Sequence, residues 1–326
     1  MSWIRVIAAR TMSVAAGSVE APGSAVGPSS APKLLRLAAV PGTEPHKVND
    51  MLLLLRPAWP GAPARGGSVC GTGNPEERQR EQHHHQHVVF FPGDIQNFQE
   101  EMVQHAEGAQ WQNWSFECVA LILGRRFPRH HVWVVRASRM YLHKFSSYCN
   151  FVQSNLFGAP EHSADHGAVR HLKALLSNGL ERAGLRSSAS VFPPPGFSLV
   201  LVGFSKGCVV LNQIVHELEG VQADSDLAPF LSSITDIYWL DGGHPGGSGT
   251  WVTEQRVLEV LAASGIALHA HVTPYEVRDP MRSWVGHEHQ RFVRMLEGLG
   301  AHLSNTLHFE DEPASIDNHF RVILEF

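Results

Sequence analysis

Cysteine is scarce in this chain, and its placement excludes two classes of protein. Four cysteines occur among the 326 residues, Cys70, Cys118, Cys149 and Cys208, and none forms a C-x-x-C pair with another. A zinc ribbon needs such pairs, and a disulfide scaffold needs closely spaced cysteines in a much shorter chain. Neither class fits this sequence.

Long apolar runs and an excess of positive charge are also missing. The longest apolar stretches span about five or six residues, far fewer than the roughly 20 that a membrane-spanning helix needs. The 26 Lys and Arg residues are outnumbered by 31 Asp and Glu residues, which gives a net charge of −5. We therefore expect no transmembrane segment and no nucleic-acid partner, because nucleic-acid-binding proteins usually carry excess positive charge.

The segment 1–32 differs in composition from the rest of the chain. It opens with MSWIRVIAARTMSVAAGSV, which contains Arg5 and Arg10 and no acidic residue before Glu20. Spaced arginines among Ser, Ala and apolar residues are typical of a mitochondrial transit peptide, and no continuous apolar region indicates a secretory signal. We predict a transit peptide and disordered segment at 1–32, and a location in the mitochondrial matrix. A merely disordered N-terminus is the alternative.

Strands and helices alternate over 33–326, interrupted by a low-complexity loop at 56–87 that is rich in Pro, Gly and charge and carries the run HHHQH. Most of the expected strands are apolar on both faces, as in SLVLVG at 198–203. This pattern is typical of a mainly parallel sheet that is flanked by helices on both faces. The 43% hydrophobic content is enough for a core. We predict a single α/β domain over 33–326.

The sequence Gly203-Phe204-Ser205-Lys206-Gly207 lies between an expected strand and an expected helix. It has the form G-x-S-x-G, in which a tight turn presents a nucleophilic Ser above the sheet and the glycines prevent clashes. The helix N-terminus and the N–H of Lys206 can stabilise an oxyanion there. The motif and its context predict an α/β-hydrolase-like fold with Ser205 as the nucleophile.

A serine hydrolase of this fold needs an acid and a His that follow the Ser in the chain. His319, in SIDNHF, follows the last expected strand, and we expect it in a loop, where it would take the proton of Ser205. Asp279 follows the strand at 266–273 and is our preferred triad acid. Asp241, which ends the preceding strand in WLDGGH, remains the alternative acid.

The second donor of an oxyanion hole comes from the turn after an earlier strand. The sequence FFPGD ends the strand at 88–91, and Gly93 would allow a close backbone approach there. We therefore expect the oxyanion hole at Gly93, Asp94 and Lys206. A metal site built from His269, His271 and neighbouring groups is disfavoured against buried histidines with hydrogen-bond partners, and we expect no metal and no cofactor.

Several long and irregular segments resemble one family. The strings VVFFPGDIQNF, LVGFSKGCVVLNQ, YWLDGGHPGGS, HVTPYEVRDPMRSW and IDNHFRV are similar to those of the family named for chromosome 2 open reading frame 69. The resemblance extends from about residue 88 to the end, and is weaker over 33–56. It implies mitochondrial residence, a serine-hydrolase-like fold and a role in mitochondrial energy metabolism that bears on the respiratory chain.

Two functions are therefore expected from the sequence. The first is a mitochondrial serine hydrolase of the esterase, lipase or thioesterase class, which acts on a small-molecule or lipid ester through an acyl-enzyme on Ser205. The second is a catalytically silent scaffold of the same fold that binds a protein partner. Retention of a Ser, a His and two candidate acids in the required order favours the enzyme, although folds outlive their activities.

Overall fold

The computed structural model describes residues 32–56, 86–155 and 158–326. Almost all of the expected transit peptide and most of the expected low-complexity loop lie outside these residues. Among the described residues, no helix combines the length and the apolar character needed to cross a bilayer.

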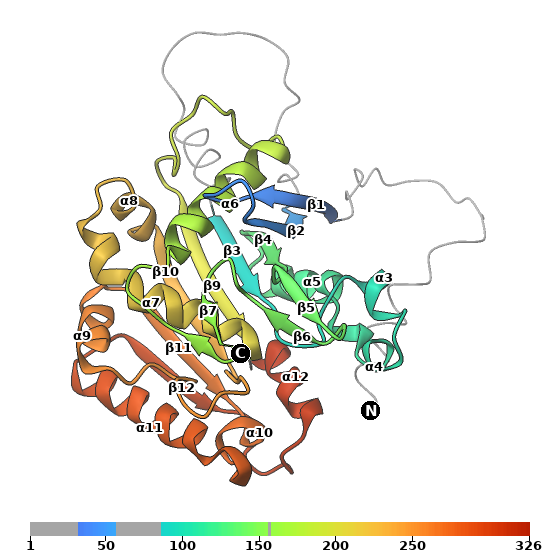
Figure 1. Ribbon diagram of the computed structural model, residues 1–326, viewed down its shortest axis with the longest axis vertical. Coiled ribbons are helices and arrows are strands. Elements are labelled where there is room, and N and C mark those ends of the chain that lie inside the picture. Colours follow the sequence, from blue (N-terminus) through green and yellow to red (C-terminus); the bar gives the residue numbers. More distant parts are fainter. Residues whose placement is uncertain (1–31, 57–85, 156–157) are drawn as a thin grey trace, which may run out of the picture.

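In the described part of the chain, eight strands form one central sheet (Figure 1). The two pairs β1–β2 and β2–β4 are antiparallel, and all other neighbours are parallel. In sheet order the strands are β1 (Lys33–Pro41), β2 (Val48–Leu55), β4 (His131–Val135), β3 (Gln86–Phe91), β9 (Ser198–Phe204), β10 (Ile234–Leu240), β11 (Ala267–Val272) and β12 (Leu303–Leu307).

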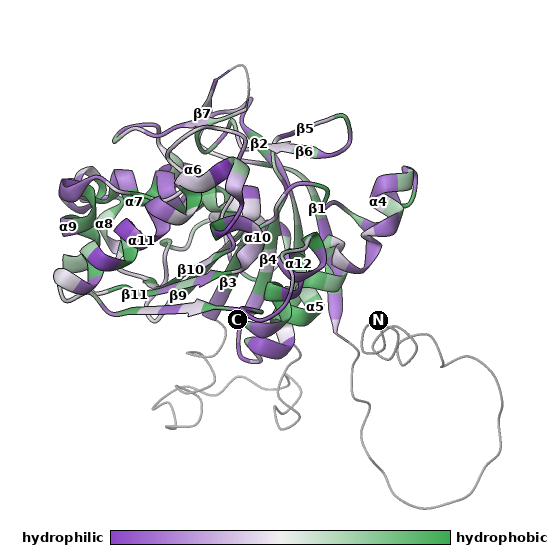
Figure 2. Ribbon diagram, turned by 90° about the horizontal axis from the view of Figure 1, so that it is seen from below, coloured by the Kyte–Doolittle hydropathy of each residue, from purple (hydrophilic) through white to green (hydrophobic). Residues whose placement is uncertain are grey.

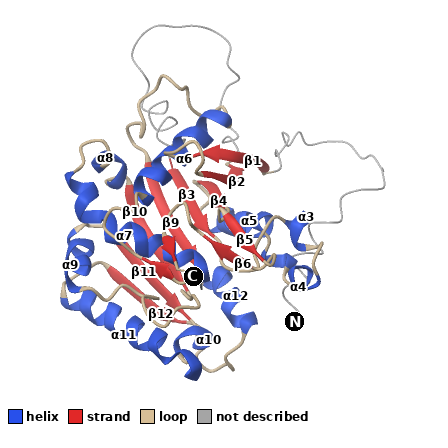
Figure 3. Ribbon diagram, viewed as in Figure 1, coloured by secondary structure: helices blue, strands red, loops and turns tan. Residues whose placement is uncertain are grey.

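Helices cover both faces of this sheet (Figure 3). Side chains of α6 (Ala168–Arg182), α7 (Cys208–Ala223), α9 (Gln255–Ala263) and α11 (Ser283–Gly298) share one hydrophobic core with the sheet. Side chains of α5 (Phe116–Arg126) and α12 (Ile316–Glu325) form a second core on the other face. The mainly parallel sheet between two helical layers confirms the predicted α/β-hydrolase-like fold.

Short elements connect these layers. They are the helices α3 (Gln99–Met102), α4 (Ala106–Gln110), α8 (Ala228–Leu231) and α10 (Pro274–Val277), the 3-10 helices η1 (Gln112–Trp114), η2 (Ser205–Gly207) and η3 (Pro280–Arg282), and the hairpins β5–β6 (Arg139–Tyr141, Phe145–Ser147) and β7–β8 (Gln153–Ser154, Pro160–Glu161).

The central strands are buried on both sides, which explains their continuous apolar sequence. Val88, Val89, Phe90 and Phe91 of β3 are all fully buried. Val88 and Phe90 belong to the core under α5 and α12, whereas Val89 and Phe91 belong to the core on the opposite face. Figure 2 shows the hydrophobic residues gathered in these strands and on the inner sides of the helices.

Three expected elements differ from the structure. The residues 95–106, whose helical spacing predicts one helix, form only α3 and the first residue of α4. The helix does not begin at Ile95, which has a left-handed φ of 71° and donates its N–H to the carbonyl of Lys144. His87, expected in the low-complexity loop, is a buried residue of β3 that accepts a hydrogen bond from Trp133. His319, expected in a loop, lies on α12.

Candidate active site

Ser205 occupies a strained turn between β9 and α7. Its φ is +50°, in the left-handed region that a nucleophile elbow requires. A Cβ atom at Gly207 would lie 1.9 Å from the carbonyl oxygen of Phe91, and one at Gly203 would lie 2.8 Å from Leu211 Cδ1. Both glycines of the G-x-S-x-G motif are therefore required by close packing, as the motif predicts.

The turn after β3 approaches Ser205 closely at Gly93. A Cβ atom added to Gly93 would lie 2.8 Å from Ser205 Cβ and 3.0 Å from Phe204 Cδ1. Any side chain at this position must therefore displace the elbow or the β3 turn. The close backbone approach expected at Gly93 is present.

We expect Gly93→Ala to lower the rate of reaction at Ser205 by about 100-fold, because a shift of the order of 1 Å in a reacting group has this effect. Gly247→Ala is the matched control, since a Cβ atom there meets nothing within 4 Å. The measurement is the second-order rate constant of labelling by a fluorophosphonate probe. Equal rates for the two variants would contradict the close approach.

The turn at Gly93 and the elbow each offer a backbone donor. The N–H of Gly93 is occupied, since it donates to Gln96 Oε1 at 2.9 Å, and the N–H of Ile95 is bonded to Lys144. Among the described residues, the N–H of Asp94 forms no hydrogen bond. Lys206 lies in the first turn of η2, where N–H groups lack partners within the helix. The backbone N–H groups of Asp94 and Lys206 are thus the two that remain free to bind an oxyanion.

The imidazole of His319 is bound to Asp241. His319 Nδ1 lies 2.7 Å from Asp241 Oδ2, and the two residues are 5% and 0% exposed. An ionised carboxylate only accepts hydrogen bonds, so Nδ1 carries the proton and Nε2 is left as the basic nitrogen. Thr273 holds the same carboxylate with its N–H to Oδ1 at 2.7 Å and its hydroxyl to Oδ2 at 2.6 Å.

Adjacent strands place Asp241 near the elbow. Asp241 follows β10, Ser205 follows β9, and the last residues of these parallel strands, Leu240 and Phe204, are paired in register. Asp241 itself has a φ of +47°. The site therefore lies where the carboxyl ends of the strands meet, which is the usual place for a site in an open α/β sheet.

Asp279 is not positioned to orient His319, so the preference for Asp279 over Asp241 is not supported by the geometry. Its Oδ2 accepts from Arg282 Nε at 2.8 Å and its Oδ1 accepts from the N–H of Met281 at the start of η3. The hydrogen bond from Arg282 lowers the pKa of Asp279. Arg282, three residues after Asp279, explains why this carboxylate turns away from the site.

Aromatic rings fix the His319 ring on two sides. The ring of Phe204, the residue before the nucleophile, lies 4.6 Å from the His319 ring, and the ring of Tyr275 lies 4.9 Å from it. No hydrogen bond joins the Ser205 hydroxyl to His319 in the structure. Such contacts are often long without substrate and tighten in the reacting complex.

The side chain of Lys206 turns away from the nucleophile and is buried. Its ammonium group donates to the carbonyl of Gly158, next to the β7–β8 hairpin. Burial lowers the pKa of Lys206, while the negative charge of Asp94 raises it. Burial also raises the pKa of Asp94. The backbone of Lys206 faces the site, whereas its side chain anchors a neighbouring hairpin.

Comparison with known proteins identifies the family. A family model described as C2orf69 matches residues 36–191 and 186–302. The mitochondrial protein C2orf69 homolog of Danio rerio is 59% identical over 326 residues, which cover 98% of this chain and 92% of that protein. The chain belongs to the C2orf69 family. The proteins of this name from Homo sapiens and Mus musculus are each 44% identical, over 88% of this chain and 85% of theirs.

Among solved structures, carboxyl esterase 2 of Tuber melanosporum matches this C2orf69 chain with a TM-score of 0.42 and 12% identity, over 100% of this chain and 98% of the esterase. A similarity this low does not indicate a shared activity.

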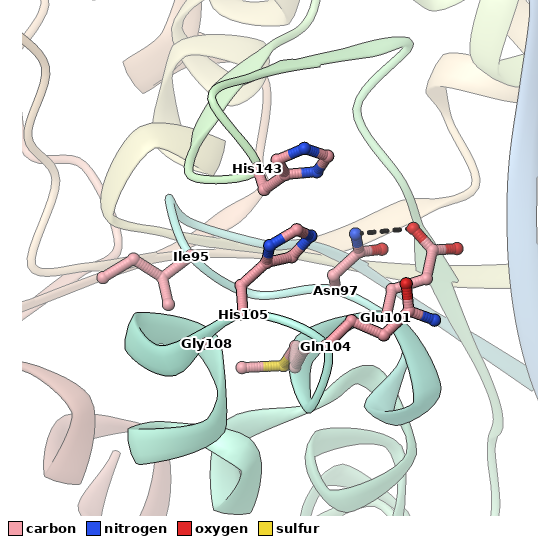
Figure 4. Close-up of a pocket in the computed structure, with 8 residues that line it drawn as sticks. Ile95, Asn97, Glu101, Gln104, His105, Gly108 and His143 are labelled. Carbon is pink, nitrogen blue, oxygen red and sulfur yellow. Dashed lines mark hydrogen bonds between the residues drawn. The ribbon is translucent and has the colours of Figure 1, made fainter.

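A pocket of about 230 Å³ lies beside the Gly93 turn of this C2orf69 chain. It is lined by Ile95 and by residues of the α3–α4 segment, and His143 from the β5–β6 turn closes it (Figure 4). The His143 ring stacks on His105 at 3.9 Å, and Asn97 donates to Glu101 beside them. The β5–β6 hairpin is fastened to the same turn, since the N–H of Ser146 donates to Asp94 Oδ1.

Other histidines of this C2orf69 chain have structural partners. His269 bonds to Asp236 and Ser304, and His271 bonds to His308. No group of three or more His, Cys, Asp or Glu residues that could hold a metal ion occurs within the described residues. The side chains of the histidines considered as a metal site bind partners other than Asp241, and only the backbone carbonyl of His271 contacts that residue, by accepting from its N–H.

Several residues of the site were not identified from the sequence. Thr273 could have been recognised as the N-cap of α10, where its hydroxyl accepts from Tyr275. The contact of Thr273 with Asp241 depends on the pairing of β10 with β11, which no local motif indicates. Phe204 and Glu276 carry no sequence signal of their own, because their roles depend on the position of α12.

Proposed function

We propose that this chain is a mitochondrial serine hydrolase that cleaves an ester or thioester through an acyl-enzyme on Ser205. The observation that carries the proposal is the buried His319–Asp241 pair, whose imidazole contacts Phe204, the residue before the strained Ser205. A carboxylate that fixes the tautomer of an imidazole, next to a presented hydroxyl, is the arrangement that activates a serine nucleophile. The substrate class is a small-molecule or lipid ester.

In the proposed reaction, Nε2 of His319 takes the proton of Ser205 while the Ser oxygen attacks the carbonyl carbon of the substrate. The negative charge that develops on the carbonyl oxygen is stabilised by the N–H groups of Asp94 and Lys206. The imidazolium then donates its proton to the leaving alcohol or thiol. Water repeats the sequence on the acyl-enzyme, which releases the acid and restores Ser205.

The proposal is tested by treating the purified protein with a fluorophosphonate probe and locating the adduct by mass spectrometry. We expect one adduct on the peptide that contains Ser205, and none after heat denaturation. A folded protein that does not react with the probe and does not hydrolyse short activated esters would exclude the enzyme. The scaffold that binds a protein partner would then replace it.

The location is proposed on two grounds. The relatives from fish, mouse and human are named mitochondrial proteins, and residues 1–32 have the composition of a transit peptide. We propose residence in the mitochondrial matrix and a role that supports mitochondrial energy metabolism.

If Arg5 and Arg10 are part of a targeting signal, replacing both with Glu should reduce import strongly, because the positive face of the presequence is lost. The measurement is protease protection of the imported chain in isolated mitochondria. Replacing both with Lys keeps the charge and is the control. Equal import of the Glu and Lys variants would contradict the proposal.

A further inference from the structure

A second buried carboxylate, that of Glu276, lies beside the His319–Asp241 pair. Glu276 belongs to α10, the short helix that follows β11 and packs against α12, and it is 3% exposed. Two other residues of the same segment already touch the pair, since Thr273 binds Asp241 and the ring of Tyr275 lies beside His319. The segment that carries Glu276 therefore lines the candidate active site.

The Glu276 carboxylate is held from one side and faces the backbone of the site on the other. Its Oε2 accepts from Arg282 Nη1 at 2.8 Å. The whole carboxylate lies against Gly243, where an added Cβ atom would lie 2.6 Å from Oε1 and 2.7 Å from Oε2. The N–H of Gly243 in turn lies 3.4 Å from the carbonyl oxygen of Ser205. Arg282 thus directs the carboxylate toward the backbone that joins Asp241 to the elbow.

The ionisation of Glu276 depends on the nearby charges of His319 and Asp241. Burial raises the pKa of Glu276 to about 7, the positive charge of His319 lowers it, the negative charge of Asp241 raises it, and Arg282 lowers it. Cys208 and Tyr275 also interact electrostatically with Glu276, and Asp279 acts on it through Arg282. Attraction between opposite charges is mutual, so an ionised Glu276 also stabilises a positive charge that develops on the imidazole.

We infer that Glu276 is a positioning residue whose carboxylate, directed by Arg282, stabilises the positive charge that His319 acquires when Ser205 is activated. The inference rests on the proposed hydrolase function and adds to it a second acid for the imidazolium. Asp241 orients the ring through a hydrogen bond, whereas Glu276 acts by its charge alone.

The dependence on pH follows from the raised pKa. Glu276 is protonated below about pH 7 and charged above it, so its support for the imidazolium is present above this pH and is lost as the pH falls. The contribution of Glu276 to folding stability depends on pH in the opposite direction. A carboxyl group whose pKa is raised from 4.5 on folding stabilises the native state below that pH, and this contribution is lost as the pH rises through about 7.

The first test needs no activity. Carbon-13 NMR of the side-chain carboxyl groups should show Glu276 titrating near pH 7. His319→Gln should raise this titration point and Asp241→Asn should lower it, each by about one unit, because each removes one nearby charge. Glu312→Gln, on an exposed residue that pairs with Arg321 of the same helix as His319, is the control. Titration near 4.5 that neither variant changes would overturn the inference.

The second test uses the rate of fluorophosphonate labelling as a function of pH. Glu276→Gln should change the shape of the profile around pH 7 and reduce the rate at pH 8.5 by about tenfold. Glu276→Asp, which keeps the charge, should restore part of the rate. Glu312→Gln, which changes an exposed carboxyl group that pairs with Arg321 and not with Arg282, should keep the wild-type profile.

Thermal unfolding separates this role from a structural one. Because ionised Glu276 is unfavourable in the fold, Glu276→Gln should not lower the Tm at pH 8, even though it slows labelling. A lower Tm together with an unchanged shape of the pH profile would show a structural role and overturn the inference. If the wild type does not react with the probe, the hydrolase proposal fails, and the NMR titrations still decide whether Glu276 is coupled to His319.

Discussion

Ser205→Ala should abolish covalent labelling by fluorophosphonates and all hydrolysis of activated esters, while the free energy of unfolding changes by about 1 kcal/mol or less. The Ser205 hydroxyl forms no hydrogen bond within the described structure, so its loss leaves no buried partner unsatisfied. Ala has the same Cβ atom, so the left-handed conformation is as strained in the variant as in the wild type. The substitution should therefore remove the activity while leaving the stability of the fold nearly unchanged.

Labelling is measured by gel fluorescence and stability by urea unfolding. Ser248→Ala, in the exposed part of the loop after Asp241, is the matched control and should react as the wild type does. Undiminished labelling of the Ser205→Ala variant would place the nucleophile elsewhere. A large loss of stability would show that the hydroxyl has a structural role that the geometry does not suggest.

Asp241→Asn should reduce turnover by about 10⁴-fold, because an amide cannot hold His319 in the tautomer that leaves Nε2 basic. The side-chain NH₂ of Asn would also face the donors of Thr273, which now bind Asp241 at 2.7 Å and 2.6 Å. Stability should fall as well, by about 1–3 kcal/mol, since the polar groups around this fully buried position lose their acceptor.

Asp279→Asn should change turnover by about twofold or less, because Asp279 is partly exposed and binds Arg282 rather than His319. The two variants are compared by the hydrolysis of a p-nitrophenyl ester, with circular dichroism to verify that both are folded. The reverse order of activities in folded variants would assign the acid to Asp279. Equal losses would indicate that both carboxylates act on the imidazole.

The strained turn at Ser205 was predictable because its determinants are local. Gly203, Ser205 and Gly207 lie within one turn, and the apolar strand before them and the helical pattern after them are visible in the sequence. The sheet was predictable for a related reason. Strands buried on both faces, such as β9, have continuous apolar sequences that distinguish them from surface elements.

The choice of acid was not predictable, because it depends on contacts between distant segments. Asp241 and Asp279 both follow parallel strands, so chain order admits either of them. The decision rests on Arg282, which neutralises Asp279 locally, and on Thr273, which directs Asp241 toward a helix 78 residues further along the chain. The late start of α3 was missed for the same reason, since the left-handed Ile95 is bonded to the distant Lys144.

The helix that follows the proposed nucleophile and the helix that carries its base pack in separate hydrophobic cores. Ser205 precedes α7, whose side chains pack in the core on one face of the sheet, whereas His319 lies on α12, in the core on the other face. Substitutions that loosen the packing of Phe320 against Trp111 and Trp114 would displace the base while α7 stays packed in the other core. Heating should therefore produce an inactive form that still contains the larger core, so loss of activity precedes loss of the fold.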